Sequence, residues 1–236
     1  LMLIAPSGFG VTAGHAPGFH SLASEVCDRE LAVEGTIPEW LSGTLIRNGP
    51  GLFESGGERV NHWFDGLAML RRYSFADGTV RYTNRFLRSE AYADAQQGAL
   101  SGQFGTDASG WRRAVAWLRS LGPPTPTDST NGHVARIDGE HVALTEAPRR
   151  LAFDPDTLET RGEFHFEDDQ PEHITAAHLV RDPHDGEWVG FATEFGLSPE
   201  YHVYRVPDGS RTRERIGSID ARGPARRLVA LPVSRP

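Results

Sequence analysis

The stretch that decides the fold reads LAMLRRYSF at residues 67–75, ADG at 76–78 and TVRYTNRF at 79–86. Two runs rich in apolar and β-branched residues lie on either side of the dipeptide Asp77-Gly78. Both central residues of a tight hairpin turn must tolerate a positive φ, so Asp-Gly between two such runs is a strong hairpin signal. We therefore predict two antiparallel strands here.

The same signal recurs along the chain. Asp138-Gly139 separates a run at 133–137 from one at 141–145, which predicts a second hairpin. Asp-Gly also occurs at 65–66, 185–186 and 208–209, and 26 glycines and 16 prolines supply frequent breaks. Residues 1–30 show no period and are predicted to be an irregular arm. From Leu31 to Pro236 the pattern predicts an all-β domain.

A weak internal repeat points to the arrangement of these strands. Leu144-Thr145-Glu146-Ala147 is echoed by Ala192-Thr193-Glu194-Phe195, and the Asp-Gly-Glu at 138–140 returns at 185–187. Repeats of about 40–50 residues built from short strands are typical of propeller blades. Seven blades would need about 300 residues or more. The chain is therefore expected to be a smaller propeller or part of one.

One segment departs from the β pattern. Residues 109–121 carry Trp111, Val115, Trp117 and Leu118 with arginines between them, and Pro123-Pro124 follows. This spacing predicts a short amphipathic helix. The helix could pack on a sheet, or it could face a membrane with Trp at the interface and Arg at the head groups, which would make a peripheral membrane contact.

Composition excludes several classes of protein. The formal net charge of −8 disfavours a nucleic-acid partner, because duplex binding needs a basic face. A single cysteine, Cys27, excludes an internal disulfide framework and suits a reducing compartment. No apolar run approaches the ~20 residues that cross a bilayer, and the start at 1–4 is too short for a signal-peptide core. We expect a cytoplasmic protein, with the peripheral membrane contact as a further expectation.

The ten histidines are the obvious candidates for metal chemistry, but their spacing alone selects none. The chain has no His-Glu-x-x-His and no Cys-x-x-Cys, and it has neither a phosphate-binding loop nor a Gly-x-Ser-x-Gly elbow. A lone histidine in a β-rich chain is more often a turn or surface residue than a ligand. We expect His184 to be exposed in a turn and His173 to lie on a loop.

Three ordered groups of segments resemble the carotenoid cleavage oxygenase family, also called the retinal pigment epithelial membrane protein family. The resemblance runs from about residue 30 to the end of the chain. The segments are GTLIRNGPG at 43–51 with NHWFDG at 61–66, then TN at 130–131 with ALTE at 143–146 and DPDTLET at 154–160, and finally TAAH at 175–178 with DP at 182–183 and GE at 186–187.

The resemblance implies a fold and a metal site. The fold would be a seven-bladed β-propeller with iron on its axis, of which this chain would form roughly the first half. Four histidines would bind Fe(II), and His178 matches the one ligand position within the chain. Glu146 matches a glutamate that holds another ligating ring. The other three ligands are expected beyond residue 236, and no catalytic acid or base is implied here. The family usually has proline after this histidine, where the chain has Leu179.

The resemblance also implies a reaction. The full-length protein would be a dioxygenase that uses O2 to cleave a conjugated double bond of a carotenoid or apocarotenoid into two carbonyl products. One alternative is a family member that cleaves stilbene-like phenylpropanoids. Another is an inactive propeller fragment that acts only as a binding surface, because a single imidazole is too few ligands for stable Fe(II) binding. We expect the 236-residue chain alone to be inactive.

Overall fold

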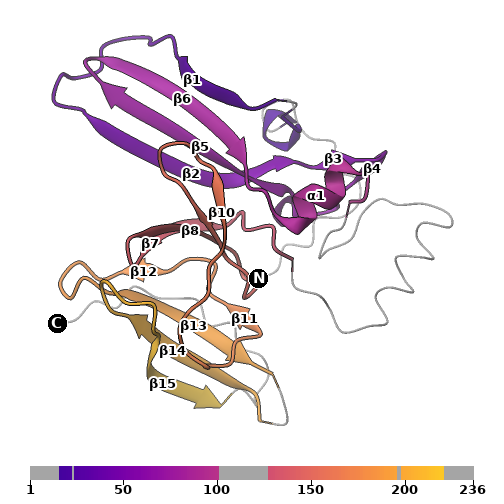
Figure 1. Ribbon diagram of the computed structural model, residues 1–236, viewed down its shortest axis with the longest axis vertical. Helices are drawn as coiled ribbons and strands as arrows, with labels where there is room; N and C mark the ends of the chain where they lie inside the picture. The colour runs from indigo at the N-terminus through magenta and orange to yellow at the C-terminus, as the bar shows by residue number, and fades with distance from the viewer. Residues whose placement is uncertain (1–15, 23, 101–126, 196–197, 221–236) are drawn as a thin grey trace.

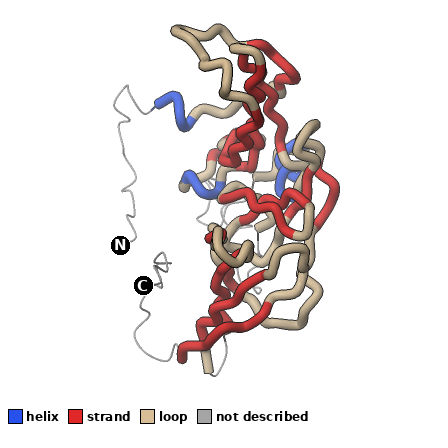
Figure 2. The backbone as a smooth tube through the Cα atoms, turned by 90° about the vertical axis from the view of Figure 1, so that its left-hand side faces the viewer, coloured by secondary structure: helices blue, strands red, loops and turns tan. Residues whose placement is uncertain are grey.

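A computed structural model of the chain describes residues 16–22, 24–100, 127–195 and 198–220. Three antiparallel sheets follow one another in chain order along the long axis of the molecule (Figures 1 and 2). The helical elements are short: η1 (Ala16–Phe19), η2 (Trp63–Asp65) and α1 (Glu90–Gln96). The described part is therefore an all-β structure, as predicted.

The first sheet has the strand order β1-β6-β5-β2. Its strands are β1 (Val26–Glu30), β2 (Gly43–Leu52), β5 (Leu67–Ala76) and β6 (Thr79–Phe86), and a small hairpin of β3 (Glu54–Ser55) and β4 (Glu58–Arg59) lies beside it. The predicted β5–β6 hairpin is confirmed, with φ of 50° at Asp77 and 73° at Gly78. Strand β1 lies inside the stretch that was expected to be an irregular arm.

The second sheet has the order β10-β9-β8-β7. It contains β7 (His133–Ile137), β8 (Glu140–Leu144), β9 (Leu151–Phe153) and β10 (Thr160–Glu163). The predicted hairpin around Asp138-Gly139 is confirmed, since both turn residues have positive φ.

The third sheet has the order β11-β13-β14-β15, and β12 pairs with β13 beside β11. Its strands are β11 (Ile174–Thr175), β12 (Val180–Arg181), β13 (Trp188–Glu194), β14 (Glu200–Val206) and β15 (Glu214–Asp220). The repeated Thr-Glu motif follows the end of β8 in the second sheet and ends β13 in the third. The internal repeat therefore marks equivalent strands of successive sheets.

The Asp-Gly pair at 65–66 does not form a hairpin turn. Asp65 ends η2, and Gly66 is extended with φ −63° and ψ 141°. A Cβ built on Gly66 would lie 2.6 Å from Pro50 Cβ and 2.7 Å from the Phe53 ring. Glycine is needed here for close approach between segments, whereas its usual role in an Asp-Gly pair is to allow a turn.

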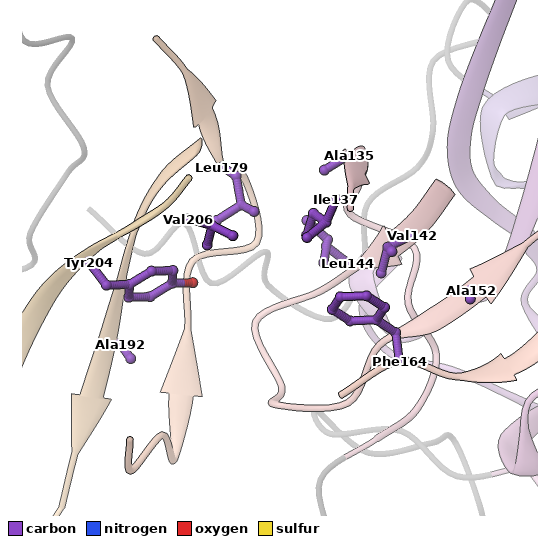
Figure 3. Close-up of a cluster of buried hydrophobic side chains, with 10 residues drawn as sticks. All are labelled: Ala135, Ile137, Val142, Leu144, Ala152, Phe164, Leu179, Ala192, Tyr204 and Val206. Atoms are coloured by element: carbon purple, nitrogen blue, oxygen red, sulfur yellow. The ribbon is translucent and has the colours of Figure 1, made fainter. Parts of the chain in front are cut away.

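Two apolar clusters hold neighbouring sheets together. One joins the first and second sheets through residues Ala68, Leu70, Leu87, Ala143, Leu151, Phe153 and Leu158. The other joins the second and third sheets, and Figure 3 shows its side chains facing one another from the two sides. The core therefore consists of apolar side chains that are buried between successive sheets, as expected for stacked propeller blades.

The helix predicted at 109–121, with its membrane-facing alternative, lies outside the described residues. Within the ranges that the structure describes, no helix is both long enough and apolar enough to cross a membrane.

Candidate metal centre

The two predicted site residues lie on neighbouring segments. Glu146 follows β8 of the second sheet, and His178 lies in the connection between β11 and β12 of the third. The backbone N–H of Thr175 donates a hydrogen bond to the carbonyl oxygen of Glu146 over 2.9 Å. The segment that leads to His178 is thereby fixed to the segment that carries Glu146.

Buried neighbours anchor His178 on both sides. Ala176 is buried, and its N–H donates to the Phe191 carbonyl of β13 over 2.8 Å. Leu179 is buried in the apolar cluster between the second and third sheets. The His178 side chain itself is exposed, and its ring forms no hydrogen bond with any residue that the structure describes. The backbone of the loop is therefore held in place, and the imidazole of His178 remains accessible to a bound ion or molecule.

Glu146 is also exposed, and its carboxylate makes no hydrogen bond or ion pair with a described residue. The structure brings the Glu146 backbone close to the segment of His178 without bringing the two side chains into contact. Its expected role, accepting the N–H of a ligating ring other than His178, stays a prediction.

A third residue, His133, lies beside His178. The centroids of the two imidazole rings are 5.1 Å apart, and the ring planes are tilted by 58°. His133 is the first residue of β7 and is half-buried. Burial lowers the pKa of His133 below its ordinary value, and the neighbouring charge of His178 lowers it further. Both effects keep this imidazole neutral, which is the form that binds metals.

Side-chain amides fix the position of β7. Asn48 Nδ2 donates to the Thr130 carbonyl over 2.5 Å and to the His133 carbonyl over 3.2 Å. Asn131 Nδ2 donates to the carbonyls of Phe64 and Gly66 over 2.7 Å and 2.6 Å. Segments 43–51, 61–66 and 130–131, quoted above for their resemblance, are therefore in direct contact. Together they set where β7 begins.

Gly132 allows β7 to approach the loop of His178 closely. Its N–H donates to the Leu144 carbonyl over 2.9 Å. A Cβ at this position would lie 3.0 Å from that carbonyl oxygen and 3.4 Å from Ala177 Cβ. An added Cβ would therefore press on the Leu144 carbonyl oxygen while only touching Ala177, the residue that precedes His178.

Sequence reasoning treated His133 as an ordinary strand residue, but the pattern held a signal. Side chains at i, i+2 and i+4 of a strand share one face. Ala135 and Ile137 of β7 are buried, so His133 lies on the inward face of its strand. A histidine on that face, one strand away from a candidate ligand, could have been marked as a partner. The expectations for His173 and His184 are confirmed, since both are exposed and lie in loops.

The donor types present fit an iron site in part. Neutral imidazole suits Fe(II), and a carboxylate that accepts the far N–H of a ligating ring fixes its orientation. Among the described residues, His178 and His133 supply two imidazoles at this place, fewer than the four that the resemblance implies.

A separate group of carboxylates, Asp182, Asp185 and Glu187, lies at the turn between β12 and β13. Turn chemistry and ion pairing account for its geometry. Asp182 Oδ1 accepts from the His184 N–H over 2.8 Å, and Glu187 lies 3.5 Å from Arg205. We assign no metal to it.

Comparisons with known proteins identify the class to which this fold and site belong. The family described as "Retinal pigment epithelial membrane protein" matches residues 19–226. The chain is 34% identical over 185 residues to the mitochondrial carotenoid-cleaving dioxygenase of Pongo abelii, covering 74% of the chain and 33% of that protein. It is 33% identical over 210 residues to carotenoid cleavage dioxygenase 8 homolog B, chloroplastic, of Oryza sativa subsp. japonica, covering 86% of the chain and 36% of that protein.

Solved structures agree with the sequence comparisons. A variant of the Synechocystis apocarotenoid oxygenase superposes with a TM-score of 0.73 and 26% identity, covering 87% of this chain and 44% of that one. A cobalt-substituted form of the same oxygenase gives a TM-score of 0.71 at 26% identity, covering 86% of this chain and 43% of that one. The architecture is thus the propeller fold of the carotenoid oxygenases.

The chain belongs to the retinal pigment epithelial membrane protein family, the family of the carotenoid oxygenases. It spans about a third of the length of the curated relatives that it matches.

Proposed function

We propose that the protein containing this chain is an Fe(II)-dependent dioxygenase that cleaves a conjugated carbon–carbon double bond of a carotenoid or apocarotenoid. The observation that carries the proposal is the presentation of His178, whose ring is exposed on a loop anchored by buried residues on both sides, in a chain of this family. An anchored but unengaged imidazole is what a metal centre requires from the protein.

His178 would hold the metal through a ring nitrogen of its neutral imidazole. Glu146 would accept the N–H of another ligating ring and so fix its orientation. Iron, when bound at such a site, supplies the activation of O2 that the protein side chains cannot provide.

The contribution of the chain is to set the position of the ligand. The hydrogen bond from Thr175 to Glu146 joins the second and third sheets directly beside the site. Leu179 and Ala176 hold the loop against the core, so the His178 ring needs little reorganisation to bind. A fixed ligand loses less conformational entropy on binding than a mobile one.

The substrate class follows from the relatives, whose names refer to carotenoids and apocarotenoids. O2 would be the second substrate, and contact with a membrane surface would give access to an apolar polyene. A cytoplasmic location with peripheral membrane contact is part of this proposal.

The test uses the full-length natural protein that contains this chain, loaded with Fe(II). The protein is incubated in air with an apocarotenoid and, separately, with a hydroxylated stilbene, and products are identified by mass spectrometry. We expect two carbonyl fragments from the apocarotenoid. Cleavage of the stilbene alone would favour the phenylpropanoid alternative. If an iron-loaded sample cleaves neither compound, the dioxygenase proposal is wrong and a non-catalytic binding role remains.

A further inference from the structure

His202 carries a buried imidazole that the proposed reaction does not use. It lies on β14, which β13 separates from β11 and β12, so its strand is not adjacent to the segment that carries His178. The His202 side chain is only 2% exposed, and both of its ring nitrogens have partners. Nδ1 lies 3.0 Å from Ser218 Oγ, and Nε2 lies 3.2 Å from Glu194 Oε2.

The register of the third sheet brings these three side chains together. Strands β13, β14 and β15 lie side by side (Figure 1). Ala192 is paired with His202, and His202 is paired with Ser218. Residues that are directly opposite share a face of the sheet, and so do residues i and i+2 of one strand. Glu194 is two positions from Ala192, so it lies on that same face.

The partners of the His202 ring determine the directions of the two hydrogen bonds. A neutral imidazole donates from one nitrogen and accepts at the other. The Glu194 carboxylate can only accept, so in the neutral ring Nε2 carries the proton and donates it. Nδ1 is then the acceptor, and the Ser218 hydroxyl donates to it. The lone pair of a buried base thus points at a serine hydroxyl.

A serine, a histidine and a carboxylate joined in this order form the arrangement that activates a serine as a nucleophile. Both distances fall within the about 2.6–3.2 Å that proton transfer between such groups requires. Ser218 belongs to β15, in which every residue is exposed. An external molecule can therefore reach the serine, while the imidazole beneath it is shielded from water.

The free edge of β15 can supply donors for an oxyanion. In the described part of the chain, no strand pairs with this edge. Alternate N–H groups of an edge strand point away from the sheet, so at least one N–H among residues 217–219 is unpaired beside Ser218. Such an N–H stabilises the negative charge that develops on a carbonyl oxygen under attack. A Cβ built on Gly217 would have no atom within 4 Å, so there is room for a small acyl group.

We infer that Ser218 is a nucleophile toward small activated carboxylic esters, with His202 as its general base and Glu194 as the residue that positions the imidazole. Ser218 Oγ forms a bond to the carbonyl carbon, and His202 accepts the hydroxyl proton. The bond from the carbonyl carbon to the leaving oxygen breaks, and the alcohol or phenol leaves with that proton or as its anion. Water then cleaves the acyl-serine in the same way. This activity requires neither iron nor His178.

The test uses the full-length natural protein that contains this chain, with p-nitrophenyl acetate as the probe. Release of p-nitrophenolate is followed by its absorbance, and acetylated residues are located by peptide mass spectrometry. We expect an acetyl group on Ser218. Ser218→Ala should abolish this acetylation and slow the release, whereas the control Ser42→Ala, which removes another exposed serine, should change neither. Because a general base contributes about 100-fold or more, His202→Gln should slow acetylation of Ser218 by at least that factor.

Two glutamates provide a matched pair for the positioning role. Glu194 and Glu200 both have side chains that are 40% exposed, and Glu200 Oε2 lies 3.7 Å from His202 Nδ1 without bonding to it. Glu194→Gln and Glu200→Gln each remove one negative charge beside the ring, but only the first removes the carboxylate that accepts from Nε2. Glu194→Gln should slow acetylation by at least about tenfold, and Glu200→Gln should change it little.

Ser218→Ala and Glu194→Gln alter side chains that are not buried, so the test does not depend on how well the buried His202 variant folds. The inference is overturned if Ser218 of the wild type carries no acetyl group, or if a folded His202→Gln protein is acetylated there at the wild-type rate. Equal losses in Glu194→Gln and Glu200→Gln would overturn the assignment of Glu194 and attribute its effect to charge alone.

Discussion

Arg150 and Glu172 form a two-point ion pair between the second and third sheets, with Arg150 Nη1 2.9 Å from Glu172 Oε1 and Arg150 Nη2 2.5 Å from Glu172 Oε2. Glu172 also lies 2.7 Å from Arg213, which bonds Asp168. The ring of Phe166 contacts both guanidinium groups, and its centroid lies 4.7 Å from that of Arg150 and 4.8 Å from that of Arg213. This network lies just before the strand that leads to His178.

Removing one member of the network should be costly. Arg150→Ala removes a buried guanidinium group and leaves the half-buried Glu172 carboxylate with one partner fewer, and such losses destabilise proteins by about 3–5 kcal/mol. Chemical denaturation should show a loss of this size. The control is Arg161→Ala, which removes an exposed partner of Asp154 and should cost about 1 kcal/mol or less. Equal losses in the two variants would contradict the structural role of the network.

Gly190 of β13 lies beneath the loop of His178 and has no room for a side chain. A Cβ there would lie 2.6 Å from Leu179 Cδ2 and 2.8 Å from the Tyr204 hydroxyl. Gly190→Ala should therefore destabilise the chain by about 1–3 kcal/mol through overpacking. Gly217→Ala adds the same methyl group where nothing lies within 4 Å, and its unfolding midpoint should stay close to that of the wild type. An unchanged midpoint in Gly190→Ala would show that the contact with Leu179 is wrong.

The pKa of His141 lies below the ordinary 6.5, first because burial disfavours the charged ring and then because of the charge of Arg136. Asp156 and Asp154 oppose this, and Arg161 reinforces it. As pH falls below 6.5, the unfolded chain takes up a proton before the folded chain does, so the free energy of unfolding decreases. The contribution of His141 to the free energy of unfolding is complete above the pKa that its ring has in the unfolded chain. It is lost as the pH falls through the lower pKa that the ring has in the folded chain.

The check is denaturation between about pH 7.5 and pH 5.5, where the titration of a histidine lies. His141→Gln removes the titrating ring, so the unfolding free energy of this variant should fall less steeply with acidification than that of the wild type. Identical pH dependence in the two proteins would exclude His141 as a source of the effect.

Strand β15 is an exposed edge strand that carries two isoleucines. All seven of its residues are exposed, including Ile216 at 57% and Ile219 at 53%. One edge pairs with β14, and in the described part of the chain no strand pairs with the other. An exposed strand edge of this kind promotes association. We expect concentration-dependent association of the 236-residue chain in light scattering.

Ile219→Lys should reduce this association, because an edge lysine opposes strand pairing. Val33→Lys is the matched control, since it places the same charge at an exposed apolar residue outside any strand. Equal reduction by both variants would attribute the effect to net charge and not to the edge.

Local signals in the sequence predicted much of the fold. The hairpins predicted at Asp77-Gly78 and Asp138-Gly139 are confirmed. A two-residue turn is determined mainly by the φ angles of its own two residues, and these are positive at both sites. Asp65-Gly66 forms no hairpin, because Gly66 packs closely against Pro50 and Phe53, which lie earlier in the chain. A contact between segments that are distant in sequence produces no pattern in the local sequence.

The candidate site was predictable only in part, for the same reason. His178 was identified through its resemblance to the family. His133 lies 45 positions earlier in the chain, and its proximity depends on how the second sheet packs on the third. The amide contacts of Asn48 and Asn131 that fix β7 likewise join segments that are distant in sequence.

The most direct test of the central claim is the iron content of the full-length natural protein after removal of unbound metal, measured for the wild type, His178→Ala and the control His184→Ala. The claim that His178 binds the catalytic iron predicts stoichiometric iron in the wild type and in the control, and loss of both iron and carotenoid cleavage in His178→Ala. Glu146→Gln should weaken both without unfolding the protein. Retention of iron and undiminished cleavage by His178→Ala would contradict the account.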